Sequence, residues 1–176
     1  MERTDSAPVE CWPSADRVPD DEAALVMAAQ GDRRAFAPLY AHYARPVYRY
    51  CYRRLGDQEA AEDATSQTFI KALDGLGRFR GGTFRSWLFT IADRVVTDRY
   101  RRRRPEVGIE EAAALAGAEG GPEEMAIAAE TRRSLHTALG QLTSDQQRVV
   151  ALRLAGLTGP EIATVVGRDH EAVKGL

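Results

Sequence analysis

The sequence contains little cysteine and little histidine. Its 176 residues include two cysteines, Cys11 and Cys51, and three histidines that are scattered along the chain. A disulfide framework or a zinc site needs several such residues at close spacing, so the sequence predicts neither of them. The same scarcity argues against a histidine cluster for catalysis. We therefore expect a protein that needs no metal and no cofactor.

Long hydrophobic runs are also missing. No stretch approaches the roughly 18 consecutive apolar residues that cross a membrane, and residues 1–21 lack the apolar segment of a secretory signal. We therefore expect a cytoplasmic protein without a membrane partner. With 44% hydrophobic and 28% charged residues, the composition is globular, and the chain is long enough for one ordinary domain or two small ones.

Lysine is scarce, and the arginines that replace it are unevenly distributed. The chain has 2 lysines among its 24 basic residues. Nine arginines and two aspartates lie between Arg78 and Arg104, which gives this stretch a charge of +7 in a chain of net charge -2. Codon composition explains part of the arginine bias, but not its concentration in one segment. The asymmetry favours a polyanion partner over a solvated surface helix.

The arginine-rich stretch carries a helical pattern. Apolar residues from Phe84 to Val95 recur at the spacing of one helix face, which predicts that this face packs inward. The opposite face, expected to point outward, carries Ser86, Phe89, Thr90, Asp93, Arg94, Thr97 and Arg101. Two glycines before the helix allow a tight loop that brings Phe79, Arg80 and Phe84 side by side. Arginines that hold phosphates, next to rings that stack on bases, are typical of a site for unpaired nucleic acid.

Capping residues and periodicity divide the chain before this stretch into shorter elements. They predict helices at about 20–30, 32–55 and 57–76, each preceded by an aspartate that can cap it. Gly31 stands at the expected end of the first helix, and Gly56 at the end of the second. Residues 1–19 lack periodicity, so we expect a disordered tail there.

Composition changes abruptly after the arginine-rich stretch. Residues 105–130 contain seven glutamates and no basic residue, with several helix-breaking glycines, which predicts an acidic flexible linker. Beyond it, Thr143 with Gln146 and Thr158 with Glu161 form capping-box patterns. Helix, short turn and helix is the arrangement that places a second helix in the DNA major groove, although other helical hairpins share these signals.

Two blocks of the sequence resemble the extracytoplasmic-function group of bacterial RNA polymerase sigma factors. FRGGTFRSWLFTIA, followed by the basic run, is similar to the segment that melts promoters. SDQQRVVALRLAGLTGPEIATVVGRDHEAVK is similar to the domain that reads the -35 promoter element. The resemblance implies an all-α fold of two small helical domains. Its expected parts are a disordered tail at 1–19, a domain for polymerase docking and the -10 element at 20–104, the linker at 105–130 and a helix-turn-helix domain at 131–176.

The resemblance implies an initiation factor that is not an enzyme. Its expected partners are core RNA polymerase, through the beta-prime and beta subunits, promoter DNA and an anti-sigma factor. Contacts with the -10 element are expected from Phe79, Arg80, Thr83, Phe84, Arg85, Phe89, Arg94, Thr97, Arg101 and Arg102. Contacts with the -35 duplex are expected from Arg168, His170, Glu171 and Lys174. AEDATSQTFIKAL is similar to the segment that docks on the beta-prime subunit, which makes Asp63, Ser66, Gln67, Ile70 and Lys71 the expected docking patch.

The chain departs from the family pattern in several places, among them Ser66, where Gln is common, Arg168, where an apolar residue is common, and Ala172, where Thr is common. Many members have Arg-Asn where Asp93 and Arg94 stand. Members also continue the last helix for several more turns, so we expect a C-terminally shortened form with an incomplete recognition helix and weak -35 recognition.

Two other functions fit parts of the sequence. One is a helix-turn-helix regulator that binds duplex DNA without polymerase. The other is an interaction protein that occupies polymerase or an anti-sigma factor without starting transcription. Binding to core polymerase and opening of a premelted promoter would separate the three functions.

Overall fold

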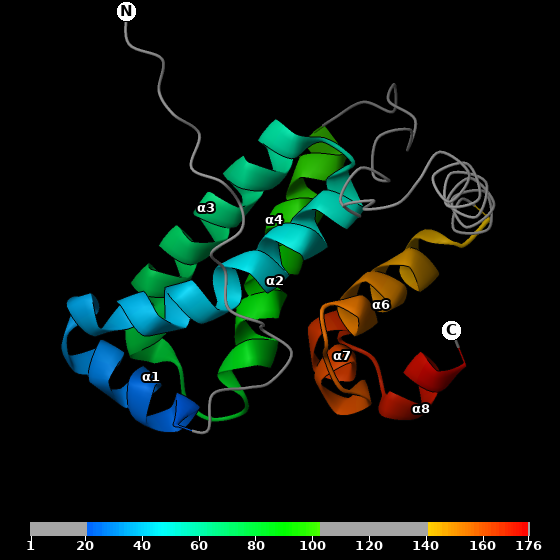
Figure 1. Ribbon diagram of the computed structural model, residues 1–176. Coiled ribbons are helices and arrows are strands. Elements are labelled where there is room, and N and C mark those ends of the chain that lie inside the picture. Colours follow the sequence, from blue (N-terminus) through cyan, green and yellow to red (C-terminus); the bar gives the residue numbers. More distant parts are fainter. Residues whose placement is uncertain (1–20, 103–140, 176) are drawn as a thin grey trace, which may run out of the picture.

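The computed structural model describes residues 21–102 and 141–175, and every regular element within them is helical (Figure 1). The all-α fold expected from the sequence is thereby confirmed. None of the described helices is both long and apolar enough to cross a membrane. The expected tail at 1–19 and the acidic linker at 105–130 lie outside the described residues, so the division into two linked domains stays a prediction.

The first helical unit comprises residues 21–102. Its elements are α1 (Glu22–Gly31), the 3₁₀ helix η2 (Arg33–Phe36), α2 (Ala37–Leu55), α3 (Gln58–Gly75), the 3₁₀ helix η3 (Leu76–Arg78) and α4 (Phe84–Arg102). Two of the three predicted aspartate caps are present: the Asp32 side chain accepts a hydrogen bond from the Arg34 N–H at 2.9 Å, and Asp57 accepts one from the Ala60 N–H at 2.7 Å. The third is not formed, since the side chain of Asp21 before α1 makes no capping hydrogen bond. Gly56 ends α2 with φ 69°, a left-handed conformation that favours glycine.

Aromatic side chains fill the core of the first unit. Tyr43 and Tyr50 on α2, and Phe84 and Phe89 on α4, are all fully buried. The ring of Phe84 lies 5.5 Å from that of Tyr43, and the rings of Tyr50 and Phe89 meet nearly edge to face at 5.7 Å. Such pairs add to the stabilisation from apolar burial. They fix α4 firmly against α2.

The second helical unit comprises residues 141–175. Its helices are α6 (Ser144–Leu154), α7 (Gly159–Val166) and α8 (His170–Lys174). At the start of α6 the Gln146 N–H donates to the Thr143 hydroxyl at 3.3 Å, and the Thr143 N–H donates to the Gln146 side chain at 2.9 Å. This reciprocal pair confirms the predicted capping box. At the start of α7 both the N–H and the hydroxyl of Thr158 donate to the Glu161 carboxylate.

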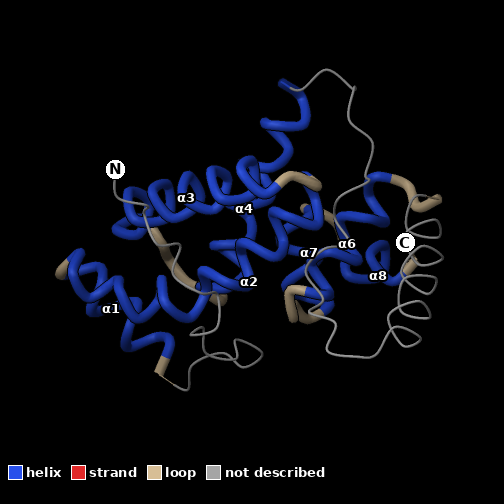
Figure 2. The backbone as a smooth tube through the Cα atoms, turned by 45° about the horizontal axis from the view of Figure 1, so that its top comes forward, coloured by secondary structure: helices blue, strands red, loops and turns tan. Residues whose placement is uncertain are grey.

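The two units pack against each other. Figure 2 shows α6 and α7 beside α2 and α4, and the contacts agree, since α6 packs on α2 and α7 packs on α4. Buried apolar residues run without interruption from one unit into the other. The helix α8 packs on α7, on the opposite side of the molecule from α1. The helix α4 is therefore enclosed on more than one side.

Candidate nucleic-acid interface

Three cationic side chains and an indole ring line one open cavity near the end of α3. The cavity has a volume of about 320 Å³ and is lined by Lys71, Gly75, Arg78, Trp87, Ile91 and Arg94. A Cβ atom on Gly75 would lie 3.3 Å from the Trp87 ring, so glycine lets α3 approach the indole closely. None of the six lining residues is acidic. Cations beside an accessible aromatic ring suit the phosphates and bases of an unpaired strand.

The loop before α4 has the predicted form. Gly81 and Gly82 adopt left-handed conformations, with φ 81° and 78°. The turn brings the rings of Phe79 and Phe84 to 6.2 Å from each other. Arg80 lies beside them, exposed, and its guanidinium donates to the carbonyl of Gly77 at 2.7 Å. The sequence therefore predicted this loop from its glycines, because few other residues adopt such conformations.

The face of α4 that was expected to point outward is largely buried, and this expectation was wrong for three residues. Ser86 is 6% exposed, Phe89 0% and Asp93 3%. The physical reason is that α7 packs on α4 from the side opposite α3, so α4 has two buried faces. A single apolar stripe in the sequence identifies only one of them.

The expected -10 residues separate into accessible and buried sets. Arg80, Thr83, Arg94 and Arg101 are exposed, and Phe79 and Thr97 are half-buried. Phe84, Arg85 and Phe89 are buried, and the side chain of Arg102 is not among those described. In this arrangement the side chains of Phe84, Arg85 and Phe89 face protein and not solvent. Phe84 therefore belongs to the aromatic core that its place in the apolar stripe also predicted.

Of the six residues that line the cavity, Arg94 alone was among the expected -10 contacts, and Lys71 was expected in the docking patch. The arginine and the aromatic residue that were missed are Arg78 and Trp87. The basic stretch included Arg78, but its position on η3, opposite α4, depends on the fold. Trp87, Ile91 and Arg94 follow each other at the spacing of one helix face, which is a signal that the sequence did contain. We had assigned Trp87 and Ile91 wholly to the core, whereas both are half-buried.

The expected docking patch forms one exposed surface on α3. Asp63, Ser66, Gln67, Ile70 and Lys71 all reach solvent. Ile70 is 61% exposed, which leaves a large apolar side chain accessible to a partner. Asp63 lies 3.4 Å from Arg99 of α4 in an exposed ion pair, an interaction of little consequence for stability. Lys71 also lines the cationic cavity, so the two candidate surfaces adjoin.

Two of the four expected -35 residues line a hollow between α7 and α8. Arg168 and His170 both line it, together with Thr164 and Asp169. Arg168 is ion-paired with Asp145 of α6. His170 packs so tightly on Gly159 that a Cβ there would come within 2.3 Å of the imidazole. Glu171 is exposed, and the side chain of Lys174 is not described.

Asp169 stands at the N-cap position of α8. Although an aspartate often caps a helix, the Asp169 side chain makes no capping hydrogen bond. The α8 helix instead begins with a main-chain bond from Val173 to the Asp169 carbonyl.

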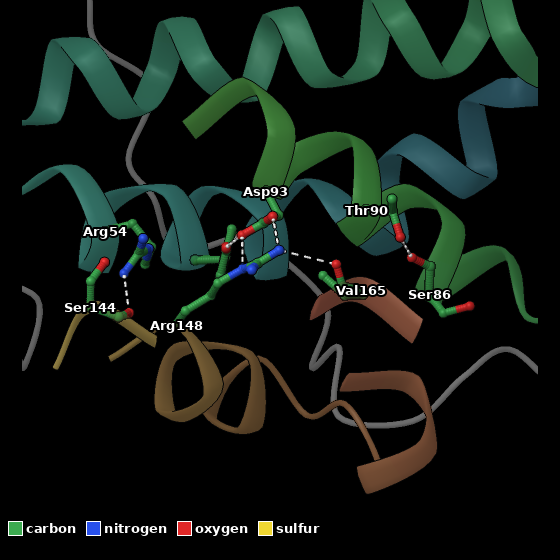
Figure 3. A network of polar contacts seen from close by, with 8 residues as sticks. Arg54, Ser86, Thr90, Asp93, Ser144, Arg148 and Val165 are labelled. Atoms are coloured by element: carbon green, nitrogen blue, oxygen red, sulfur yellow. Dashed lines mark hydrogen bonds and ion pairs between the residues drawn. The ribbon is translucent and has the colours of Figure 1, made fainter. Parts of the chain in front are cut away.

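A polar network joins the two helical units where α4 was expected to be free (Figure 3). The Asp93 carboxylate accepts hydrogen bonds from the Tyr50 hydroxyl at 2.8 Å and from Arg148 Nε at 2.7 Å. A second Arg148 nitrogen bonds the other Asp93 oxygen and reaches the Val165 carbonyl at 3.1 Å. Burial, followed by the charge of Asp93, raises the pKa of Tyr50 well above its ordinary value. Burial lowers the pKa of Arg148, but its bond and attraction to Asp93 outweigh this and raise it, so Arg148 stays charged.

Groups suited to covalent or metal chemistry do not gather in the described parts of the chain. Among residues 21–102 and 141–175, no three of the histidine, cysteine, aspartate and glutamate side chains could hold one metal ion. Burial raises the pKa of the Cys51 thiol to about 12, which keeps it protonated and unreactive. The prominent features are instead charged and aromatic surfaces for binding.

Comparisons with known proteins identify the family of the chain. The family model for sigma-70 region 2 matches residues 39–106. The ECF sigma factor BldN of Streptomyces coelicolor is 39% identical over 170 residues, which cover 93% of this chain and 64% of BldN. This chain therefore spans less than two thirds of that relative. The ECF sigma factor SigD of Mycobacterium tuberculosis is 30% identical over 165 residues, 87% of this chain and 76% of SigD.

A solved structure has a similar fold. CnrH, in complex with the cytosolic domain of CnrY, superposes with a TM-score of 0.66 at 27% identity, over 89% of each chain. Sequence and fold thus agree over most of the length. The chain belongs to the extracytoplasmic-function group of RNA polymerase sigma factors.

Proposed function

We propose that this chain directs core RNA polymerase to promoters and holds the unpaired strand of the -10 element during initiation. The observation that carries the proposal is the cavity in which Lys71, Arg78 and Arg94 surround the half-buried Trp87. Cations bind the phosphates of a strand, and a ring stacks on a base only after the duplex has opened. The site therefore prefers single-stranded over double-stranded DNA.

Polymerase docking belongs to the exposed patch on α3. Asp63, Gln67 and Ile70 offer a charge, an amide and an apolar side chain on one helix, beside the cationic cavity. A partner held there would bring its DNA close to Arg94. This adjacency supports the beta-prime subunit as the docking partner, with the beta subunit completing the contact.

The second unit supplies a duplex-binding surface. The hollow lined by Arg168 and His170 lies between α7 and α8, where a helix-turn-helix contacts DNA. We assign it to the -35 element. Since CnrH forms a complex with the cytosolic domain of CnrY, we also propose an anti-sigma partner for this chain, which then works in the cytoplasm beside polymerase.

The proposal is tested by binding to core polymerase followed by opening of a premelted promoter. Asp63→Lys reverses a charge on an exposed residue, so it should weaken polymerase binding while the melting temperature stays nearly unchanged. Arg78→Ala with Arg94→Ala should leave polymerase binding intact and weaken strand capture. The exposed Arg34, on η2, provides the matched control. Normal promoter opening by the Arg78 and Arg94 variant would reject the cavity as the site that binds the unpaired strand.

Salt dependence gives an independent measurement. If about five phosphates are contacted, the logarithm of affinity should fall with the logarithm of salt concentration at a slope of roughly -3.5 to -4.5. Each phosphate contact removed from a single strand reduces the slope by about 0.7. The slope measured for the Arg78→Ala, Arg94→Ala variant should therefore be smaller in magnitude by about 1.4. An unchanged slope would mean that both side chains merely face water.

A further inference from the structure

The polar contacts between the two helical units converge on α4. Besides the Asp93 and Arg148 pair, Arg85 of α4 donates to the Ala155 carbonyl at 2.8 Å, and Thr83 donates to the Glu161 carboxylate at 2.9 Å. Gly156 makes the Arg85 contact possible, because a Cβ there would lie 2.4 Å from the guanidinium. Three side chains of the first unit, Thr83, Arg85 and Asp93, are thus held by groups from α6, α7 and their connecting turn.

These contacts cover residues that the -10 assignment needs. Arg85 is buried and bonded to the Ala155 carbonyl of the second unit, and the Thr83 hydroxyl is bonded to Glu161. The accessible remainder is the cavity with Lys71, Arg78 and Arg94, together with the exposed Arg80 and Arg101. The docked arrangement therefore exposes only one part of the surface that α4 could offer to a strand.

Asp93 is the charge on which docking depends. It is 3% exposed, and a buried carboxylate without a counter-charge is strongly unfavourable. In the docked form Arg148 supplies that counter-charge through both Asp93 oxygens. If the units separated, Asp93 would face water and would need no partner. Removal of Arg148 therefore destabilises the docked form selectively.

The interface also contains groups that docking leaves unsatisfied. Arg54 Nε and Arg85 Nε are buried without a hydrogen-bond partner, although other nitrogens of the same side chains bond to Ser144 and Ala155. Water would satisfy both Nε groups in a separated form. An interface that combines a charged pair with two unsatisfied nitrogen groups suits reversible docking.

We propose that Arg148, Asp93 and Tyr50 form a latch that keeps α6 to α8 docked on α4, and that its release increases the affinity of α4 for unpaired DNA. The first half concerns conformation alone. The second half rests on the proposed function, because it names unpaired DNA as the competitor for the same face. If the docked form makes up about nine-tenths of the molecules and binds the strand much more weakly because Arg85 is buried and Thr83 is bonded to Glu161, release should raise the apparent affinity by up to about tenfold.

The latch is tested on the full chain by the distance between two spin labels. Ala41→Cys on α2 and Thr164→Cys on α7 place labels at exposed positions of the two units, in a background with Cys11→Ser. The remaining Cys51 is buried. Pulsed electron resonance should give one short distance, and Arg148→Met should shift the distribution to longer and broader distances while far-UV circular dichroism is retained. Arg148→Lys, which keeps the charge but not the two-pronged contact, should lie between them.

Arg168→Met is the matched control, because the Arg168 and Asp145 pair lies within the second unit. It should leave the distance unchanged. An unchanged distance in both Arg148→Met and Asp93→Asn would overturn the latch. If unlabelled Arg148→Met binds a single-stranded -10 oligonucleotide about tenfold more tightly, the competition is supported. The direction is diagnostic, because loss of a positive charge alone would weaken DNA binding.

The two proposals fail in different ways. Longer distances with unchanged, measurable DNA affinity would overturn the competition and leave the proposed function standing. Absence of DNA binding in wild type and variants, free or with core polymerase, would reject the proposed function, while the label distances would still decide the latch.

Discussion

The two helical units are stabilised in different ways. The first has a core built around buried rings, with Tyr43 and Phe84 at its centre. The second, over residues 141–175, has no aromatic residue and depends on small aliphatic groups such as Leu152 and Ile162. Large rings bury much more apolar area per residue, so a unit without them gains less from its own core.

The difference explains why the second unit lies against the first. A unit whose described core contains no large ring gains less from its own burial and profits more from contact with a second core. Packing on α2 and α4 adds apolar contact, and the Arg148 and Asp93 pair fixes the relative position. The first unit thus has a core of its own, whereas part of the core of the second unit is formed by contact with the first. Four predictions follow from this contrast, in order of decreasing effect.

Phe84→Ala should have the largest effect. The ring is fully buried among Phe36, Tyr43 and Trp87, and its removal leaves a cavity at the centre of the first unit. We expect a loss of about 3–5 kcal/mol in the free energy of unfolding, measured by urea denaturation. Phe79→Ala, at a half-buried ring of the loop, should cost clearly less. Equal losses of unfolding free energy in both variants would mean that the Phe79 ring and the Phe84 ring contribute equally to stability.

Ile162→Ala should destabilise the second unit more than the first. Ile162 is fully buried on α7, and its truncation should cost about 2–4 kcal/mol. Near-UV circular dichroism reports the rings of the first unit, and its signal should survive at urea concentrations where α6 to α8 have unfolded. Leu154→Ala is the control, since that side chain is 58% exposed. Simultaneous loss of both signals would show that the units unfold as one.

Thr143→Ala should have a moderate, local effect. It removes the hydroxyl that accepts from Gln146 at the start of α6, which should cost about 1 kcal/mol. The neighbouring Ser144→Ala leaves this capping bond in place and should cost less. Urea denaturation of the two variants measures the difference. If Ser144→Ala proved the more harmful, the cap would belong to Ser144.

Glu161 should give the smallest effect, and it should depend on pH. Burial raises the pKa of this carboxyl, but hydrogen bonds from Thr158 and Thr83 lower it more, so the net shift is downward from 4.5. A lowered folded-state pKa means that the carboxylate adds stability above the unfolded value, and that this stability disappears as the pH falls through the folded value. The stability difference between wild type and Glu161→Gln should therefore shrink between about pH 7 and pH 3.5. A constant difference would indicate a contribution from packing alone.

Local signals in the sequence predicted most of the helices. Asp57, Gly56 and the Thr143 capping box mark helix ends through contacts within a few residues, so they work before any tertiary structure forms. The aromatic loop before α4 was predictable for the same reason. Position-specific motifs, rather than periodicity, identified the family.

The sequence did not reveal which residues of α4 meet the second unit. Phe89 and Asp93 were expected at the surface because they lie opposite the apolar stripe, and both are buried. A helix that is covered on two sides needs two inward faces. One inward face of α4 includes Arg85 and Asp93, and a hydrophobic pattern in the sequence predicts such charged residues to be solvent-exposed. Only contact with a segment more than 50 residues away gives such charges their partners.

The sequence by itself determined the helical elements, their ends, the concentration of arginine and the family. It could do so because capping, periodicity and charge are properties of neighbouring residues. The tertiary structure decided which arginines line the cavity with Trp87, and it paired Asp93 with Arg148 between the units. These outcomes depend on how α3, α4 and α7 pack in space, and packing joins residues whose separation along the chain carries no signal of contact.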